Sequence, residues 1–194
     1  NRGNALKDLN RLEEAISSYD LAISINSSYA KAHSNRGNVL KDLNRLNEAV
    51  ASYDIAINLM PDYANAHSNR GDALKELNQI EQAIECYVRA IALNPGIEFI
   101  MGELLKAKMS LCSWSGLTEQ INEIKTKINN NEKVSIPLSL LAIIDDPLLQ
   151  KQSAEIYINA KYPQNNVLPK IERQAKNLKI QIGYFSADFR DHAV

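Results

Sequence analysis

An asparagine recurs at the same place in three closely similar stretches of the sequence, at Asn1, Asn35 and Asn69, with 34 residues between successive copies. We call these three residues the asparagine column. A carboxamide carries both a hydrogen-bond donor and an acceptor, so it can pair with the C=O and the N–H of a peptide. A row of carboxamides on one surface could therefore hold an extended polypeptide by its backbone. The same side chains could instead bond only to neighbouring repeats, and the sequence leaves both interpretations open.

A second candidate site lies near the C-terminus. Residues 179–185 are rich in apolar and β-branched side chains, unlike the helical patterns before them, and they predict a β-strand. Asp188 and His192 follow within the next seven residues. Ligands of α/β folds gather beyond the carboxyl ends of strands, and an imidazole can move a proton or donate to a phosphate near neutral pH. The alternative is that His192 only fixes the loop in which it lies.

The elements that position the asparagine column are predicted by the repeat itself. The stretch that begins at Asn1 returns almost unchanged from Asn35 and again from Asn69. A fixed period of this length is typical of stacked helical hairpins, each too small to bury its apolar face alone. Small and large residues recur in step, and proline closes the second helix of two units (Gly37, Ala49, Ala56, Leu40, Tyr53, Ile57 and Pro61; Gly71, Ala83, Ala90, Leu74, Tyr87, Ile91 and Pro95).

Residues 1–97 resemble about 2.7 units of the tetratricopeptide repeat (TPR) family, because size, periodicity and the closing prolines agree. The resemblance implies a superhelix of hairpins whose first helices line a concave binding surface. Arginine stands where the family usually has an apolar residue before the glycine. We expect the guanidinium groups of Arg36 and Arg70 to reach solvent or an acid such as Asp20 or Asp54.

Composition excludes several classes of partner. The chain has 22 basic and 23 acidic residues and no long run of like charge, so we expect neither nucleic-acid nor membrane binding. Its two cysteines form no C-x-x-C pair, which argues against a disulfide framework or a zinc site and favours the cytoplasm. Because Asn1 falls inside a repeat, we expect the sequence to be part of a longer protein.

After residue 97 the 34-residue register decays. Helices are predicted at 98–113, 115–128, 137–144 and 147–161. We interpret residues 98–178 as a degenerate capping hairpin and a helical linker, and residues 179–194 as the beginning of a truncated α/β domain. The predicted fold class is thus mainly α, with the first strand of a second domain at the end.

Two segments of the sequence resemble the O-GlcNAc transferase family, including its bacterial and SPINDLY-type members. They are Leu105–Trp114, similar to the helix that follows the repeats in that family, and Ile182–His192, similar to its first catalytic strand and loop. The resemblance implies a glycosyltransferase-B-like domain that moves N-acetylglucosamine from a nucleotide diphosphate donor to Ser or Thr of proteins. It implies a catalytic role for His192 and a substrate-holding role for the asparagine column.

The chain by itself is expected to be inactive, since only two residues follow His192 and no lysine for a diphosphate or pocket for uridine is recognisable. A UDP-GlcNAc-like donor belongs to the complete protein, and we assign no cofactor or metal to this part. Its expected partners are protein or peptide substrates in the concave groove. The alternative function is a non-catalytic TPR scaffold.

One type of TPR groove is disfavoured by the sequence. TPR adaptors that bind the C-termini of chaperones clamp carboxylates with lysine and arginine, but the corresponding positions here are Ser34, Asn65 and Asn69. None of these side chains carries a positive charge, so the sequence predicts no carboxylate clamp.

Overall fold

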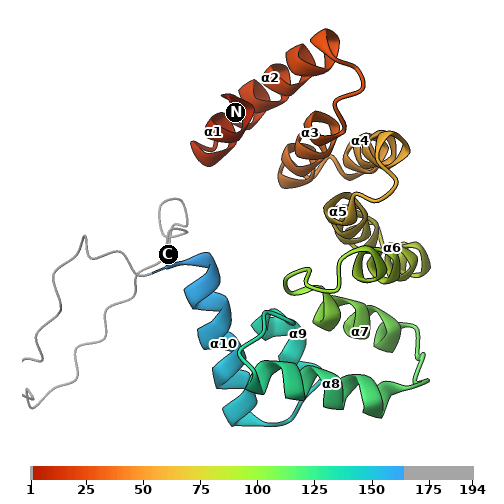
Figure 1. Ribbon diagram of the computed structural model, residues 1–194, viewed down its shortest axis with the longest axis vertical. Helices are drawn as coiled ribbons and strands as arrows, with labels where there is room; N and C mark the ends of the chain where they lie inside the picture. Colours follow the sequence, from red (N-terminus) through yellow and green to blue (C-terminus); the bar gives the residue numbers. More distant parts are fainter. Residues whose placement is uncertain (1, 164–194) are drawn as a thin grey trace, which may run out of the picture. The chain divides into compact units, whose positions relative to one another are not determined.

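The computed structural model describes residues 2–163, and within this range the chain forms ten α-helices and no β-strand (Figure 1). The helices are α1 (Arg2–Asp8), α2 (Leu12–Ile25), α3 (Ala30–Asp42), α4 (Leu46–Leu59), α5 (Ala64–Glu76), α6 (Ile80–Leu93), α7 (Ile100–Ser110), α8 (Leu117–Asn129), α9 (Pro137–Leu141) and α10 (Pro147–Lys161). Asn1, the strand predicted at 179–185 and His192 lie outside the described residues. None of the ten helices is long and apolar enough to cross a membrane.

Helices α1 to α6 form three hairpins with the same turn. In the turn between α3 and α4, Asn44 has a φ of 58°, and the N–H of Arg45 donates to the C=O of Leu40 at 2.8 Å. Asparagine tolerates this left-handed conformation better than most residues. Asn10 and Asn78 occupy the equivalent positions with φ values of 57° and 59°. The recurrence of Leu-Asn in the sequence therefore fixes how each second helix folds back on the first.

The interior of each hairpin is a glycine packed against a tyrosine ring. A Cβ atom added to Gly37 would lie 2.6 Å from the Cε1 atom of Tyr53, closer than packed carbon atoms approach. Tyr53 itself is fully buried. Gly71 faces Tyr87 in the same way. The small and large residues that recur in the sequence are thus two sides of one contact.

The arginines join successive hairpins, as the sequence predicted. Nε of Arg36 in α3 donates to Oδ1 of Asp20 in α2 at 2.6 Å, and its Nη1 donates to Oγ of Ser52 in α4 at 2.8 Å. Arg70 makes the equivalent bond to Asp54 at 2.7 Å. Each guanidinium therefore ties three helices from two repeats together.

The helices after residue 97 depart from the hairpin pattern. Gly102 in α7 packs against Ser135 rather than against an aromatic ring, and its N–H donates to the C=O of Val134 at 3.1 Å. A separate apolar core holds α7, α8, α9 and α10 together (Leu105, Ile124, Ile128, Val134, Leu140, Ile144 and Leu149). The segment between α8 and α9 thus takes the place that a tyrosine of the second helix fills in the repeats.

Candidate polypeptide-binding surface

The first helices of the hairpins share one side of the stack. Figure 1 shows α3 and α5 on the same side, with α4 and α6 on the other. Polar residues of α1, α3 and α5 recur along this side, and we call them the first-helix surface (Asn4, Lys7, Asn35, Asn38, Lys41, Asn69, Asp72 and Lys75). A cavity of about 340 Å³ opens beside α5, where Asn69, Asp72 and Lys75 contribute to its lining. We call it the α5 cavity.

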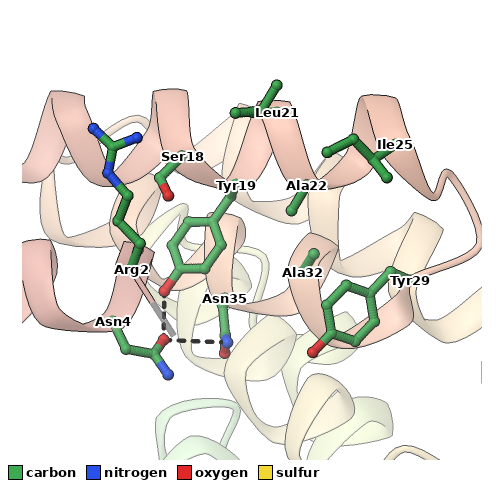
Figure 2. Close-up of a pocket in the computed structure, with 11 residues that line it drawn as sticks. Arg2, Asn4, Ser18, Tyr19, Leu21, Ala22, Ile25, Tyr29, Ala32 and Asn35 are labelled. Atoms are coloured by element: carbon green, nitrogen blue, oxygen red, sulfur yellow. Dashed lines mark hydrogen bonds between the residues drawn. The ribbon is translucent and has the colours of Figure 1, made fainter.

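The asparagine column is hydrogen-bonded between repeats. Nδ2 of Asn69 donates to Oδ1 of Asn38 in the preceding repeat at 2.9 Å. Nδ2 of Asn35 lies at a longer 3.4 Å from Oδ1 of Asn4 (Figure 2). The interpretation that these side chains bond to neighbouring repeats is therefore seen in the structure for Asn35 and Asn69.

These bonds leave part of each carboxamide available. One N–H of Asn69 is used by Asn38, and its Oδ1 has no partner within the described residues. Asn35 and Asn69 are both only half-buried, and Asn69 lines the α5 cavity. An acceptor oxygen and a second N–H can therefore still face a bound peptide. The peptide-binding role of the column stays a prediction.

Tyrosine hydroxyls complete the network, a feature that the sequence analysis missed. The hydroxyl of Tyr53 donates to Oδ1 of Asn38 at 2.8 Å, and that of Tyr87 donates to Oδ1 of Asp72 at 2.9 Å. Burial, and then the charge of Asp72, raises the pKa of both phenols, so both hydroxyls stay protonated donors. The constant separation of 15 residues between each pair was a signal in the sequence.

The lysines of the first-helix surface are engaged in ion pairs with the next unit. Nζ of Lys7 lies 3.2 Å from Asp42, and Nζ of Lys41 lies 3.4 Å from Asp72. Nζ of Lys75 lies 2.5 Å from Glu103. Because each cation has an anion beside it, the surface does not offer an array of free positive charges.

Glu103 is the second residue that the sequence analysis missed. It lies 34 residues after Asn69, so it extends the asparagine column by one unit with a carboxylate in place of an amide. Glu103 is 8% exposed and accepts hydrogen bonds from Lys75 and from Ser139 of α9. Burial alone would raise the pKa of its carboxyl, but Lys75 and Ser139 hold that pKa below its ordinary value. The charged carboxylate thus joins α5, α7 and α9.

An aromatic pair closes the α5 cavity at its far end. Phe99 precedes α7 with a φ of 64°, and its ring meets that of Tyr157 edge-on with 5.3 Å between the ring centroids. Nζ of Lys161 lies 5.4 Å from the centroid of the Phe99 ring. Both aromatic residues and Lys161 line the cavity, so α10 borders the end of the first-helix surface.

The hairpins, their shared turn and the polar side of their first helices define a helical-repeat protein of the kind that presents a long binding surface. Comparison with family models identifies the repeat. Residues 3–44 and 37–77 match the TPR repeat model, and residues 64–97 match the tetratricopeptide repeat model. Residues 3–97 are therefore tetratricopeptide repeats. No curated protein sequence matches the chain.

Solved structures with the same fold include two domains of the protein RPAP3. The first TPR of Spaghetti (RPAP3), bound to the HSP90 peptide SRMEEVD, is 27% identical, with a TM-score of 0.56 over 58% of this chain and 89% of that one. The second TPR domain of human RPAP3, in complex with the HSP70 peptide SGPTIEEVD, is 28% identical, with a TM-score of 0.53 over 55% and 89%. Both of these similar domains bind peptides.

A third structure supports the fold alone. MamA from Desulfovibrio magneticus is 21% identical, with a TM-score of 0.57 over 62% of this chain and 68% of that chain. The mainly helical TPR fold is thus confirmed. The link to glycosyl transfer gains no support from these matches.

Proposed function

We propose that residues 2–163 are a protein-binding module that holds an extended polypeptide along the first-helix surface. The observation that carries this proposal is the set of carboxamide groups left available at Asn35 and Asn69 on the side of the stack that the first helices share. The peptide complexes of the two RPAP3 domains support the same use of the fold. Carboxamides grip the backbone, so the module tolerates many side-chain sequences.

The peptide chemistry proposed here differs from that of the acidic RPAP3 peptides. Ser34 is 1% exposed and bears no charge, and neither Asn65 nor Asn69 can attract a carboxylate as a cation does. Lys41 and Lys75 are paired with Asp72 and Glu103. A neutral segment therefore suits the surface better than an acidic C-terminus does.

Replacing both Asn35 and Asn69 by alanine should weaken peptide binding. A net hydrogen bond contributes about 0.5–1.5 kcal/mol, so losing contacts at two positions should raise the Kd by about tenfold. The probe is a neutral peptide of three Ser-Thr-Ala-Pro-Val units, measured by fluorescence anisotropy beside SRMEEVD. We expect the acidic peptide to bind more weakly than the neutral one.

The matched control is the pair Asn47→Ala and Asn58→Ala, which removes two exposed carboxamides from α4 on the opposite side of the stack. This variant should bind the peptide as the parent protein does. Circular dichroism verifies that both variants keep their helicity. If Asn35→Ala with Asn69→Ala binds unchanged while folded, the column has only a structural role.

A more specific function is also proposed: recruitment of protein substrates for O-linked sugar transfer from a UDP-GlcNAc-like donor. Its support is the sequence resemblance of Leu105–Trp114 and Ile182–His192 to the O-GlcNAc transferase family. The first segment begins in α7, where Leu105 is buried in the core with α8, α9 and α10. His192, the proposed catalytic residue, belongs to the second segment, outside the described residues.

Competition tests this more specific function. An excess of the chain added to a catalytically complete transferase of the family should slow glycosylation of protein substrates, because the chain withholds them. The variant Asn35→Ala with Asn69→Ala should inhibit several-fold less. Inhibition that is absent, or equal for both proteins, would leave only the general protein-binding module.

A further inference from the structure

A second cavity lies at the other end of the repeats, beside α1 and α2 (Figure 2). We call it the α1–α2 cavity, and its volume is about 300 Å³. Figure 2 shows Leu21, Ala22 and Ile25 of α2 along one side and Ala32 and Asn35 of α3 along the other. Of these residues only Asn35 belongs to the asparagine column, so the site is largely separate from the proposed peptide surface.

The repeat shows what normally occupies such a space. α3 has 13 residues whereas α1 has 7, and Arg2 at the start of α1 is the equivalent of Arg36 inside α3. The first turns of α3, from Ala30 to Asn35, therefore have no counterpart in α1. Because the two helices of a hairpin run antiparallel, these turns of α3 lie beside the last turns of α4. The equivalent position beside the last turns of α2 is the α1–α2 cavity.

Side-chain exposure agrees with this comparison. Ile25 in the last turn of α2 is 79% exposed, whereas its equivalent in α4, Leu59, is 41% exposed. Tyr29 is exposed, and its equivalent Tyr63 is half-buried. An apolar side chain left this open gains about 25 cal/mol for each Å² that a partner covers. The cavity thus presents apolar surface that the next repeat covers with its own helix.

We propose that the α1–α2 cavity is a docking site for a helical turn of a protein with the pattern Ala-x-Ala-His-Ser. The pattern is that of the turns which fill the equivalent places, Ala30–Ser34 in α3 and Ala64–Ser68 in α5. In α3, Ala30, Ala32 and Ser34 are all at most 5% exposed, so their small size lets the helix approach closely. The ligand is a helix with small residues on one face.

The test uses the whole chain and a capped peptide, Ser-Tyr-Ala-Lys-Ala-His-Ser-Asn, which has the sequence of residues 28–35. So short a helix is unstable alone, so binding should be weak, in the millimolar range. Titration followed by ¹H–¹⁵N NMR should show saturable shifts of the Ala22 and Ile25 amide signals. The control peptide has leucine at both alanine positions and should cause no saturable shift, because its side chains do not fit.

A matched variant of the protein, Ala22→Leu, should lose the response, since the larger side chain fills the cavity from its wall. Three results would overturn the proposal: no saturable shift, equal shifts with the leucine peptide, or shifts confined to residues of the α5 cavity such as Asn69. Sedimentation provides a further decision. If the chain alone associates and thereby shields Ile25, a second copy covers this surface instead.

Discussion

Replacing Tyr53 by alanine should destabilise residues 2–163 by about 3–5 kcal/mol, the range seen when a large buried aromatic side chain is removed. Tyr53 is fully buried, its ring packs on Gly37, and its hydroxyl donates to Asn38. The cavity left behind cannot close, because Gly37 has no side chain to enter it. Urea unfolding followed by circular dichroism should show a lower midpoint, and a large part of the total stability of a typical domain would be lost.

Two variants separate the parts of this effect. Tyr53→Phe keeps the ring but leaves Oδ1 of Asn38 with only the bond from Asn69, so we expect a loss of about 1–2 kcal/mol. Tyr162→Ala removes the same side chain from a position that is 68% exposed and should change stability by less than about 0.5 kcal/mol. Equal effects of Tyr53→Ala and Tyr162→Ala would contradict the described core.

Replacing Glu103 by glutamine should destabilise the protein by about 1.5–3 kcal/mol at pH 7, the range for hydrogen bonds to charged groups. The buried carboxylate accepts from Lys75 and Ser139, and a neutral amide cannot replace its charge. Chemical unfolding at several pH values measures the difference. Glu98→Gln is the matched control, since Glu98 is an exposed partner of Lys133 and contributes at most about 1 kcal/mol.

The pH dependence of Glu103 has a definite sign. The pKa of its carboxyl is lowered in the folded protein relative to the ordinary value of 4.5. Its contribution is therefore fully present above pH 4.5 and is lost as the pH falls toward the lower, folded value. The stability difference between the parent protein and Glu103→Gln should shrink over that window. A difference that stays constant down to pH 3 would show that the carboxylate is not stabilised in the folded state.

The regular part of the fold was predictable because its causes are local and repeated. Gly37, Tyr53 and Asn44 each recur every 34 residues, and each does the same work in every hairpin. The start of α7 was less predictable. Residues 98 and 99 were expected in the helix, but Phe99 adopts a φ of 64° and α7 begins at Ile100. The N–H of Phe99 donates to the C=O of Lys133, a contact between distant residues that no local pattern reveals.

The candidate site was predictable only in part, for the same reason. The period located Asn35 and Asn69 and the acids that meet the arginines. It did not reveal that each carboxamide already donates one N–H to the preceding repeat. Glu103 was overlooked because residues around it no longer fit the repeat, although its own position does. Its partner Ser139 comes from α9, and only the folded chain brings the two together.

The most direct test of the proposed function observes the carboxamides themselves. The side-chain amide signals of Asn35 and Asn69 should be assigned by NMR and followed during titration with the neutral Ser-Thr-Ala-Pro-Val peptide. We predict saturable shifts of both signals, with the side-chain amides of Asn47 and Asn58 on α4 unchanged. Binding that shifts only the α4 signals, or that leaves the amides of Asn35 and Asn69 unmoved at saturation, would contradict the proposal.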